Sequence, residues 1–532
     1  MRVNVRKENL RSSISRDSSK GQITSQNPDK LLFTNWVQAR NVNISESDWQ
    51  VRNGIRELCD VLIGGAPADY YALDIFKKEA GNQLVIAIQD NTNAGKTEIQ
   101  KIDRTTGAKT SLYANIAGIA KGCFASQNNF LHYVNNEISV KIYSALGTST
   151  VSLPIADTKA KLCVSDGSRI WVSTDEGVTR FSDSQEISII TTFAPSGTAL
   201  DRAGIATSDI VEVTCLKSIS GYVLIAGKNQ SEIHACPNFR NDQMTTFPDD
   251  FPTLKYPFAA IGCDNNDGAV ATPHGFFIKP TYDEYLHLLP VGGAAKPYRD
   301  NSGRMGQLSF DGCRLTYDSR FNYIYIHAKE KFTQAPAIVV FDVARQAFFE
   351  YGDLFPVLWC GDSDDVYFMD RSNKIQSAFA KDVFNDNGVD INFTVRSADD
   401  FAGSQLFYKL ASRQYIDAEY WGRCSFSYNL WDMIRPSGTG GELLYTTSYL
   451  LVNNASPLSS VPNYFSTGVP DNTSFDFESD PHQHLYDIDT LINRLFFRAS
   501  VVISGRTGSR FRVCGVGFLY EPTDKHSRQI TT

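Results

Sequence analysis

One short pattern recurs along the middle of this chain, between about residue 84 and residue 380. Each copy is an apolar strand, followed by a tight polar turn and a second strand, and often by a third. Successive copies begin roughly 39 to 53 residues apart. The apolar strands that mark the copies are residues 84–88, 130–134, 169–173, 222–226, 275–279, 323–327 and 366–369.

This spacing is that of one four-stranded blade of a β-propeller. Such a unit cannot bury its apolar face alone, so it must stack on its neighbours around a common axis. Polar turns such as residues 103–107 and 135–136 separate the strands, as expected for hairpins. We therefore predict an all-β chain in which residues 61–387 form a propeller of six or seven blades.

After about residue 388 the pattern changes to longer strands with wider connections, for example 391–396, 413–420 and 509–520. Long alternating strands of this kind are typical of an antiparallel sandwich. Residues 388–532 are therefore predicted to form a β-sandwich platform domain with its own core. Residues 31–60 are expected to add strands to this platform, and only residues 487–493 have a briefly helical pattern.

The bulk composition is that of an ordinary folded protein of 532 residues, long enough for two or three domains with sizeable cores. No apolar run approaches the length of a membrane-spanning helix, and the basic N-terminus is not followed by the apolar region of a secretory signal. The ten cysteines stand far apart without a CxxC pair. We interpret them as buried, reduced thiols of a protein made in the cytoplasm.

The charge balance argues against one class of function. The chain has 59 acidic and 51 basic residues and a net charge of −8, which argues against a protein that grips nucleic acid through its phosphates. A mildly acidic wall repels a polyanion and prevents sticking. The same charge therefore suits a conduit for DNA.

Several short motifs imitate functional sites. Residues 94–97 (AGKT) match the end of a phosphate-binding loop, but Asp90 occupies the required glycine position and a strand is expected to follow. Residues 173–179 fit the Asp-box pattern, which in sialidases is a hairpin turn remote from the catalytic centre. Both motifs are interpreted as turns.

The acidic and histidine-containing segments give similarly weak support for metal binding. His482 and His484 lie among aspartates, and residues 264–268 and 362–365 have the composition of calcium loops. An EF-hand alignment on Gly268 fails at its first and twelfth ligand positions. Because no catalytic motif accompanies the blades, we expect no enzyme activity, no cofactor and no bound metal.

Residues 1–30 are rich in Ser, Asn, Gln and basic side chains and are predicted to form an extended arm. The arm is either a flexible tail or a segment that docks on an acidic neighbouring subunit. Its candidate assembly residues are Arg2, Arg6, Lys7, Arg11 and Arg16.

Two long connections, residues 238–256 and 291–307, interrupt the blades. Loops of this length are commonly functional or bind partners, so we treat them as candidates for lining or gating a channel. The candidate residues among their charged side chains are Lys296, Arg299, Asp300, Arg304, Asp249 and Asp250.

Three stretches, residues 39–58, 392–422 and 493–522, together with the blades between them, resemble the tail nozzle, or tail hub, proteins of short-tailed bacteriophages. The likeness lies in the arrangement of these segments along the chain and not in invariant motifs. It implies a structural protein of the virion, assembled in the host cytoplasm, in which a hexameric ring forms the distal channel of the tail and retains the genome until ejection.

The resemblance also implies the partners of such a ring. They are an adaptor ring or portal-side proteins, a needle, plug or fibre at the tail tip, and genomic DNA that passes through the lumen without sequence-specific contacts. No membrane-spanning segment is expected. Two alternatives remain open: a glycan-binding or sialidase-like propeller in receptor recognition, and a cellular interaction scaffold.

Overall fold

The computed structural model describes residues 11–15, 36–44, 48–63, 66–67, 69–76, 81–127, 130–137, 139–143, 150–152, 160–167, 169–174, 179–182, 193–194, 210, 212–219, 221–235, 253–258, 260, 266–279, 285–299, 307–352, 354–400, 407–433, 441–451, 483–488 and 490–526. Within these ranges every regular element longer than a single turn is a β-strand. The predicted all-β class is confirmed.

The chain divides into two compact units, one inserted in the other. The propeller unit is Arg56–Gln346 with Gly352–Ala378. The sandwich unit comprises Met1–Ile55, Ala347–Tyr351 and Phe379–Thr532. The propeller thus begins at residue 56 rather than 61 and ends at residue 378 rather than 387, and the sandwich is built from both ends of the chain.

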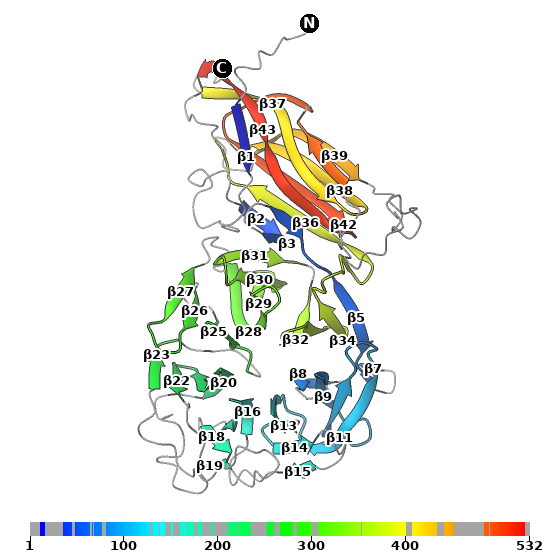
Figure 1. The fold of residues 1–532 in the computed structure, drawn as a ribbon, viewed down its shortest axis with the longest axis vertical. Helices are drawn as coiled ribbons and strands as arrows, with labels where there is room; N and C mark the ends of the chain where they lie inside the picture. The colour runs from blue at the N-terminus through cyan, green and yellow to red at the C-terminus, as the bar shows by residue number, and fades with distance from the viewer. Residues whose placement is uncertain are drawn as a thin grey trace, which may run out of the picture. The chain divides into compact units, whose positions relative to one another are not determined.

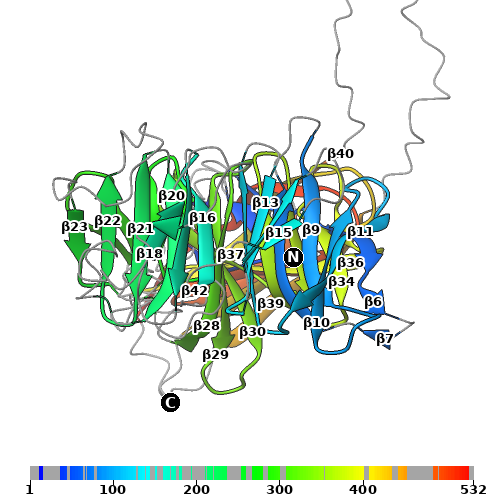
Figure 2. The same cartoon turned by 90° about the horizontal axis from the view of Figure 1, so that it is seen from below.

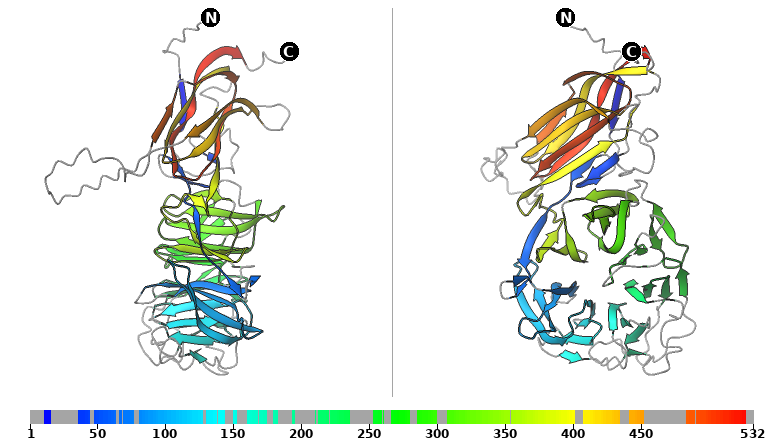
Figure 3. Two further views of the ribbon diagram at one scale, coloured as in Figure 1. Left: turned by 90° about the vertical axis from the view of Figure 1, so that its right-hand side faces the viewer. Right: turned by 180° about the vertical axis from the view of Figure 1, so that it is seen from behind.

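The propeller unit contains seven blades arranged around an axis (Figure 1), and the right panel of Figure 3 shows the ring from its other side. Blades 1 to 4 each have four strands in sequence order. Blade 1 is β8 (Tyr70–Phe76), β9 (Gln83–Gln89), β10 (Lys96–Ile102) and β11 (Lys109–Ala117); blade 2 is β12 (Cys123–Gln127), β13 (Phe130–Val134), β14 (Ser139–Tyr143) and β15 (Thr150–Ser152); blade 3 is β16 (Ala160–Ser165), β17 (Ile170–Thr174), β18 (Thr179–Ser182) and β19 (Phe193–Ala194); blade 4 is β20 (Val213–Ile219), β21 (Tyr222–Gly227), β22 (Ser231–Ala235) and β23 (Thr253–Tyr256).

The remaining three blades complete the ring, and a small two-stranded ribbon, β6 (Leu62–Ile63) with β7 (Ala66–Pro67), lies between β5 and β8 in sequence. The strands of a blade lie side by side in Figure 2. Blade 5 is β24 (Ala269–Thr272), β25 (Gly275–Ile278), β26 (Tyr285–Leu289) and β27 (Lys296–Arg299); blade 6 contains β28 (Leu308–Asp318), β29 (Tyr323–Glu330) and β30 (Pro336–Asp342); blade 7 is β32 (Pro356–Gly361), β33 (Val366–Asp370) and β34 (Lys374–Ala378), completed by β5 (Ile55–Asp60).

The seven apolar strands recognised in the sequence are the second strands of the seven blades. They are buried almost throughout, as in β9, because each blade packs between two others. One apolar cluster joins Phe76 and Val85 of blade 1 to Phe124 and Leu131 of blade 2. The innermost strands contact one another in a closed ring, in the order β8, β12, β16, β20, β24, β28 and β32.

The ring is closed by an early segment of the chain. β5 pairs with β34 of the last blade, and the amide of Val61 donates to the carbonyl of Asn373 at 2.7 Å. This closure covers the strand edge that an open array of blades would leave exposed.

The sandwich unit consists of two sheets whose inner faces share an aromatic core. Trp49 lies 5.9 Å from Phe393 and 6.1 Å from Phe511 between ring centroids, and Phe426 lies 5.2 Å from Phe511. One sheet contains β1 (Arg11–Ser15), β3 (Val42–Ile44), β4 (Trp49–Val51), β37 (Phe407–Tyr420), β40 (Gln483–Asp487), β41 (Leu491–Phe496) and β43 (Phe511–His526); the other contains β2 (Trp36–Arg40), β31 (Ala347–Tyr351), β35 (Asn385–Asp386), β36 (Val389–Ser397), β38 (Cys424–Asp432), β39 (Glu442–Leu451) and β42 (Ala499–Thr507).

The helix expected at residues 487–493 is not present, and that expectation was wrong. β40 ends at Asp487 and β41 begins at Leu491. The Asp487 carboxylate accepts hydrogen bonds from the amide of Thr490 at 3.1 Å and from its hydroxyl at 2.7 Å. Because Asp487 pairs with Ile416 of β37 and Leu491 pairs with Arg413 of the same strand, the three residues between them are too few for a helix.

Candidate functional site

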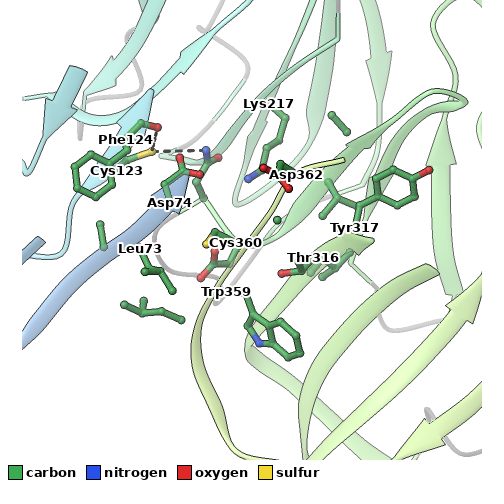
Figure 4. A pocket seen from close by; sticks show the side chains of 18 of the residues that line it. Leu73, Asp74, Cys123, Phe124, Lys217, Thr316, Tyr317, Trp359, Cys360 and Asp362 are labelled. Atoms are coloured by element: carbon green, nitrogen blue, oxygen red, sulfur yellow. Dashed lines mark hydrogen bonds between the residues drawn. The ribbon is translucent and has the colours of Figure 1, made fainter. Parts of the chain in front are cut away.

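A pocket of about 460 Å³ lies at the axis of the propeller unit (Figure 4). The innermost strands of blades 1, 2, 4, 5, 6 and 7, with the residues that flank them, form its wall. Concave sites lined by several elements are where proteins most often bind ligands. Its charged and hydrogen-bonding lining residues include Asp74, Lys217, Asn266, Asp267, Thr316 and Asp362.

The charged side chains of the pocket are mostly acidic, with three carboxylates against the one ammonium group of Lys217. Two of the carboxylates have arginine partners. Arg314 Nε lies 3.2 Å from Asp267, and Arg104 lies 2.8 Å from Asp362. The negative charge of the pocket wall is therefore partly neutralised by two arginines that do not themselves line the pocket.

Arg104 connects blade 1 to the acidic turn of blade 7. Its guanidinium group reaches Asp362 at 2.8 Å and Asp365 at 2.9 Å, and its Nε donates to the Tyr367 hydroxyl at 3.0 Å. The amides of Asp364 and Asp365 also donate to Asp362, both at 2.9 Å. The turn at residues 362–365, whose composition resembles a calcium loop, is thus bound by Arg104 and links blade 7 to blade 1.

The pKa of the Asp362 carboxyl lies below its ordinary value. Burial by itself raises this pKa, but the hydrogen bonds from the amides of Asp365 and Asp364 and from Arg104 favour the charged form and outweigh burial. Asp362 is therefore a carboxylate held in place for binding Arg104.

Asn266 extends from blade 5 across the axial pocket. Its backbone has a positive φ of 72°, and its side-chain amide donates to Cys123 Sγ of blade 2 at 3.8 Å. The thiol of Cys215 in blade 4 donates to the Asn266 carbonyl at 3.5 Å. Asparagine tolerates left-handed backbone better than most residues, which explains its use at this bridge.

The loop residues predicted to line a channel do not line the axial pocket where the structure describes them. Lys296 and Arg299 belong to β27, the outermost strand of blade 5, and Lys296 Nζ stands 4.8 Å above the Tyr298 ring. The two expected loops are therefore shorter than predicted, since β27 and β23 occupy part of them. Asp300, Arg304, Asp249 and Asp250 lie outside the described residues.

Of the predicted assembly residues, Arg11 begins β1 and is exposed. β1 pairs antiparallel with β43, with Arg11 opposite Tyr520, so this part of the arm is a strand of the sandwich unit. Arg2, Arg6, Lys7 and Arg16 lie outside the described residues.

The motifs that imitate functional sites are turns or strand ends. Lys96 begins β10, as the strand reading of the AGKT segment predicted, and Asp90 accepts hydrogen bonds from the amides of Thr92 and Asn93. Thr179 donates to Ser173 at 3.4 Å within the Asp-box segment, whose residues 175–178 lie outside the described ranges.

The described part of the histidine segment contains a contact between His484 and Asp417. His484 Nε2 lies 2.6 Å from Asp417, and His482 is outside the described residues. In the part of the chain that the structure describes, no group of three His, Cys, Asp or Glu side chains is placed to hold a metal ion.

The sequence did not single out Arg104, Lys217 or Asn266. Arg104 and Asp362 are separated by 258 positions along the chain, and no local pattern predicts such a contact. The only signal was the presence of charged residues within otherwise apolar inner strands, as in Asp74 of β8 and Lys217 of β20.

Seven blades closed around a partly acidic axial pocket define a seven-bladed β-propeller protein, in which the propeller is inserted into a β-sandwich. No family model and no curated protein matches the chain. Several solved propellers have a similar fold. Among them are a catalytically inactive virginiamycin B lyase from Staphylococcus aureus (14% identity, 61% of this chain, 99% of that chain, TM-score 0.39), the WD40 propeller of Doa1 (9%, 62%, 97%, 0.38) and YCF48 bound to a D1 peptide (12%, 62%, 96%, 0.39).

These likenesses concern the fold alone and carry nothing about substrate or partner. The assignment as a propeller rests on the strand order of the chain itself. Within the described residues, no helix has the length and apolar character required to cross a membrane.

Proposed function

We propose that this chain is a structural subunit of a short phage tail, a nozzle that forms a hexameric ring around the channel through which the genome leaves. One observation carries the proposal. The three stretches that resemble tail nozzle proteins are far apart in sequence but largely meet as paired strands of one sandwich: β4 pairs with β43, β36 with β42, and β37 with β43.

A mechanism without covalent chemistry fits the axial pocket. Asp362 and Asp267 serve in ion pairs that hold blades together, and the pairing of Arg104 to blade 7 makes the ring stiff. The net charge of −8 suits a wall past which DNA slides without sticking. In this proposal the subunit acts by shape and by repulsion.

The proposed partners are those of a nozzle ring: further copies of the chain, an adaptor ring or portal-side protein above, and a needle, plug or fibre at the tip. The test is mass spectrometry of purified phage particles combined with electron cryomicroscopy. We expect the chain in the particle, as a six-fold ring around the tail channel. A particle that lacks the chain would overturn the proposal.

The proposed role of the arm is assembly. A chain that lacks residues 1–10, and therefore keeps β1, should keep its β-sheet circular dichroism but fail to join tails in a complementation assay. A matched control is the full chain with Arg11→Lys, which preserves both charge and strand. Normal particles from the truncated chain would contradict this role.

The parts of the two predicted loops that precede β23 and follow β27 in sequence, residues 238–252 and 300–307, are proposed to line or gate the channel, with Asp249, Asp250 and Arg304 among their charged residues. Shortening either loop should leave ring assembly intact and change DNA retention, measured as genome leakage from particles. Unchanged retention and ejection in both shortened variants would count against a gating role.

A second candidate function is glycan binding in receptor recognition, and one groove of about 390 Å³ on the sandwich unit favours it. On adjacent strands Ser427 faces Ser504 on one side and Ser448 on the other, and the Ser427 and Ser504 hydroxyl oxygens are 3.2 Å apart. Arg506 and Asn392 add a guanidinium and an amide group to this serine-lined groove. Glycan-array binding that is lost in Ser427→Leu would support this candidate, and absence of binding would remove it.

A further inference from the structure

Five of the seven innermost strands of the propeller carry a cysteine, and two of these thiols lie against each other. Cys123 is on β12 and Cys163 is on β16, the neighbouring inner strand. Cys123 Sγ lies 3.2 Å from the Cys163 carbonyl oxygen, and Cys163 Sγ lies 3.3 Å from the Cys123 carbonyl oxygen. This reciprocal geometry brings both sulfur atoms into the seam between blades 2 and 3.

The two thiols differ in access. Cys123 lines the axial pocket, whereas Cys163 is not among the lining residues and is only 1% exposed. Figure 4 shows Cys123 among the side chains that line the pocket, and its sulfur accepts a hydrogen bond from the Asn266 amide at 3.8 Å. Of this pair, a small reagent that enters the pocket therefore reaches Cys123. Cys360 of β32 also lines the pocket, but burial raises the pKa of its thiol.

The surroundings of Cys123 favour its thiolate form. The pKa of Cys123 is lowered because the Cys163 thiol donates a hydrogen bond to its sulfur, against the opposing effect of burial, and Lys217 acts in the same direction while Asp74 opposes it. Burial raises the pKa of Cys163. A thiolate next to a protonated thiol is the arrangement of an attacking and a resolving cysteine.

We propose that Cys123 and Cys163 are an oxidisable dithiol that forms a disulfide between blades 2 and 3 when a small disulfide such as oxidised glutathione enters the axial pocket. The inference is independent of the nozzle proposal. It assigns a modification site to the propeller axis.

The chemistry proceeds by thiol–disulfide exchange. The Cys123 thiolate attacks one sulfur of the reagent, whose S–S bond breaks and releases one glutathione thiolate, which takes up a proton. The Cys163 thiol then loses its proton and attacks the Cys123 sulfur, so that the second glutathione leaves. Two protein thiols are oxidised and one small disulfide is reduced to two thiols.

The product links residues that are 40 positions apart and belong to different blades. A cross-link of this span restricts the unfolded chain. We expect the melting temperature of the oxidised protein to rise by about 5 °C, with the increase removed by a reducing agent.

The test is to incubate the full chain with oxidised glutathione and to map its disulfides by mass spectrometry. We expect the Cys123 and Cys163 peptides to be joined in the oxidised protein and separate after reduction. Adducts on the half-buried Cys59 and Cys514, with the Cys123 and Cys163 peptides unlinked, would overturn the proposal.

Variants then separate the two roles. Cys163→Ser should stop at a glutathione adduct on Cys123, and Cys123→Ser should leave Cys163 unmodified. The matched control is Cys215→Ser, which removes a buried thiol from another inner strand and should still give the disulfide. The disulfide mapping uses the unaltered chain. It can therefore refute the proposal even if one of the variants fails to fold.

Discussion

Single side chains join blades that the sequence places far apart, and Arg104 is the clearest case. It binds two carboxylates of blade 7 from blade 1, while its own side chain is 16% exposed and that of Asp362 only 4%. Removing the cation would leave Asp362 buried without its charged partner. Breaking a buried ion pair is far more costly than losing an exposed one.

Arg104→Ala is therefore expected to lower the unfolding free energy of the propeller unit by about 3 kcal/mol, measured by urea denaturation. The control is Lys374→Ala, which removes an exposed ion pair with Glu57 and should change stability much less. Equal effects of the two substitutions would show that Arg104 is not a buried staple.

A second residue-scale prediction concerns acid stability. Burial lowers the pKa of His327 to about 3, with Arg314, Lys329 and Arg371 acting in the same direction. The unfolded histidine titrates near its ordinary pKa of 6.5, so the unfolded state binds the proton first. The contribution of the neutral His327 ring to the unfolding free energy is therefore fully present above about pH 6.5 and is lost as the pH falls toward 3.

Between pH 6.5 and 3 this one group should reduce the unfolding free energy by at most about 1.4 kcal/mol per pH unit. His327→Gln should flatten that dependence in denaturation curves recorded at several pH values. His274→Gln, at an exposed turn position, should not. An unchanged pH dependence in His327→Gln would contradict the assignment.

At the scale of elements, the blade strands were predictable because apolar alternation is a local signal. All seven marked strands are second strands of blades, where burial on both faces makes the sequence most apolar. The outermost strands β23 and β27 were predicted as loops, because TLKY is only four residues long between Pro252 and Pro257, and KPYR contains a proline. Edge strands are held mainly by backbone hydrogen bonds, which leave little trace in the sequence.

The pairing of β5 with β34 was missed for a related reason. Its partners are distant in sequence, as the Lys374–Glu57 contact across 317 positions shows, and the sequence pattern assigned residues 31–60 to the platform. The axial pocket was likewise not predicted, because it forms only when inner strands of six blades meet.

The closing strand provides the element-scale prediction. Successive backbone amides of a strand point to opposite sides, so the double variant Glu57→Pro with Leu58→Pro removes a donor of β5 on whichever side faces β34. It should lower the unfolding free energy of the propeller unit by about 3 kcal/mol or more and expose the edge of β34. The propeller should then aggregate on mild heating, measured by light scattering. Glu57→Thr with Leu58→Thr keeps the backbone donors and should remain soluble, and similar aggregation of both variants would refute the closure argument.

At the scale of the whole molecule, two cores imply two unfolding transitions. Trp49 is 1% exposed in the aromatic core of the sandwich unit, and Trp171 is fully buried in a propeller cluster with Leu162 and Leu216. Replacing a buried tryptophan by alanine typically costs about 3–5 kcal/mol. Each substitution should destabilise only the unit that contains it.

Differential scanning calorimetry of the full chain should therefore show two transitions. Trp49→Ala should lower one midpoint, and Trp171→Ala should lower the other, so that the two variants serve as controls for each other. A single transition that shifts in both variants would show that the units unfold together.

The insertion of the propeller into the sandwich also sets an order of events on the ribosome. When residue 378 has emerged, both β5 and blade 7 are available and the propeller can close, whereas Trp49 must wait for Phe511 in the last strand. At about 5–20 residues per second the wait is on the order of ten seconds. During that interval β4 lacks its neighbour β43 and the Trp49 ring lacks Phe511, so the nascent chain has a defined window in which chaperones can bind this uncovered apolar segment.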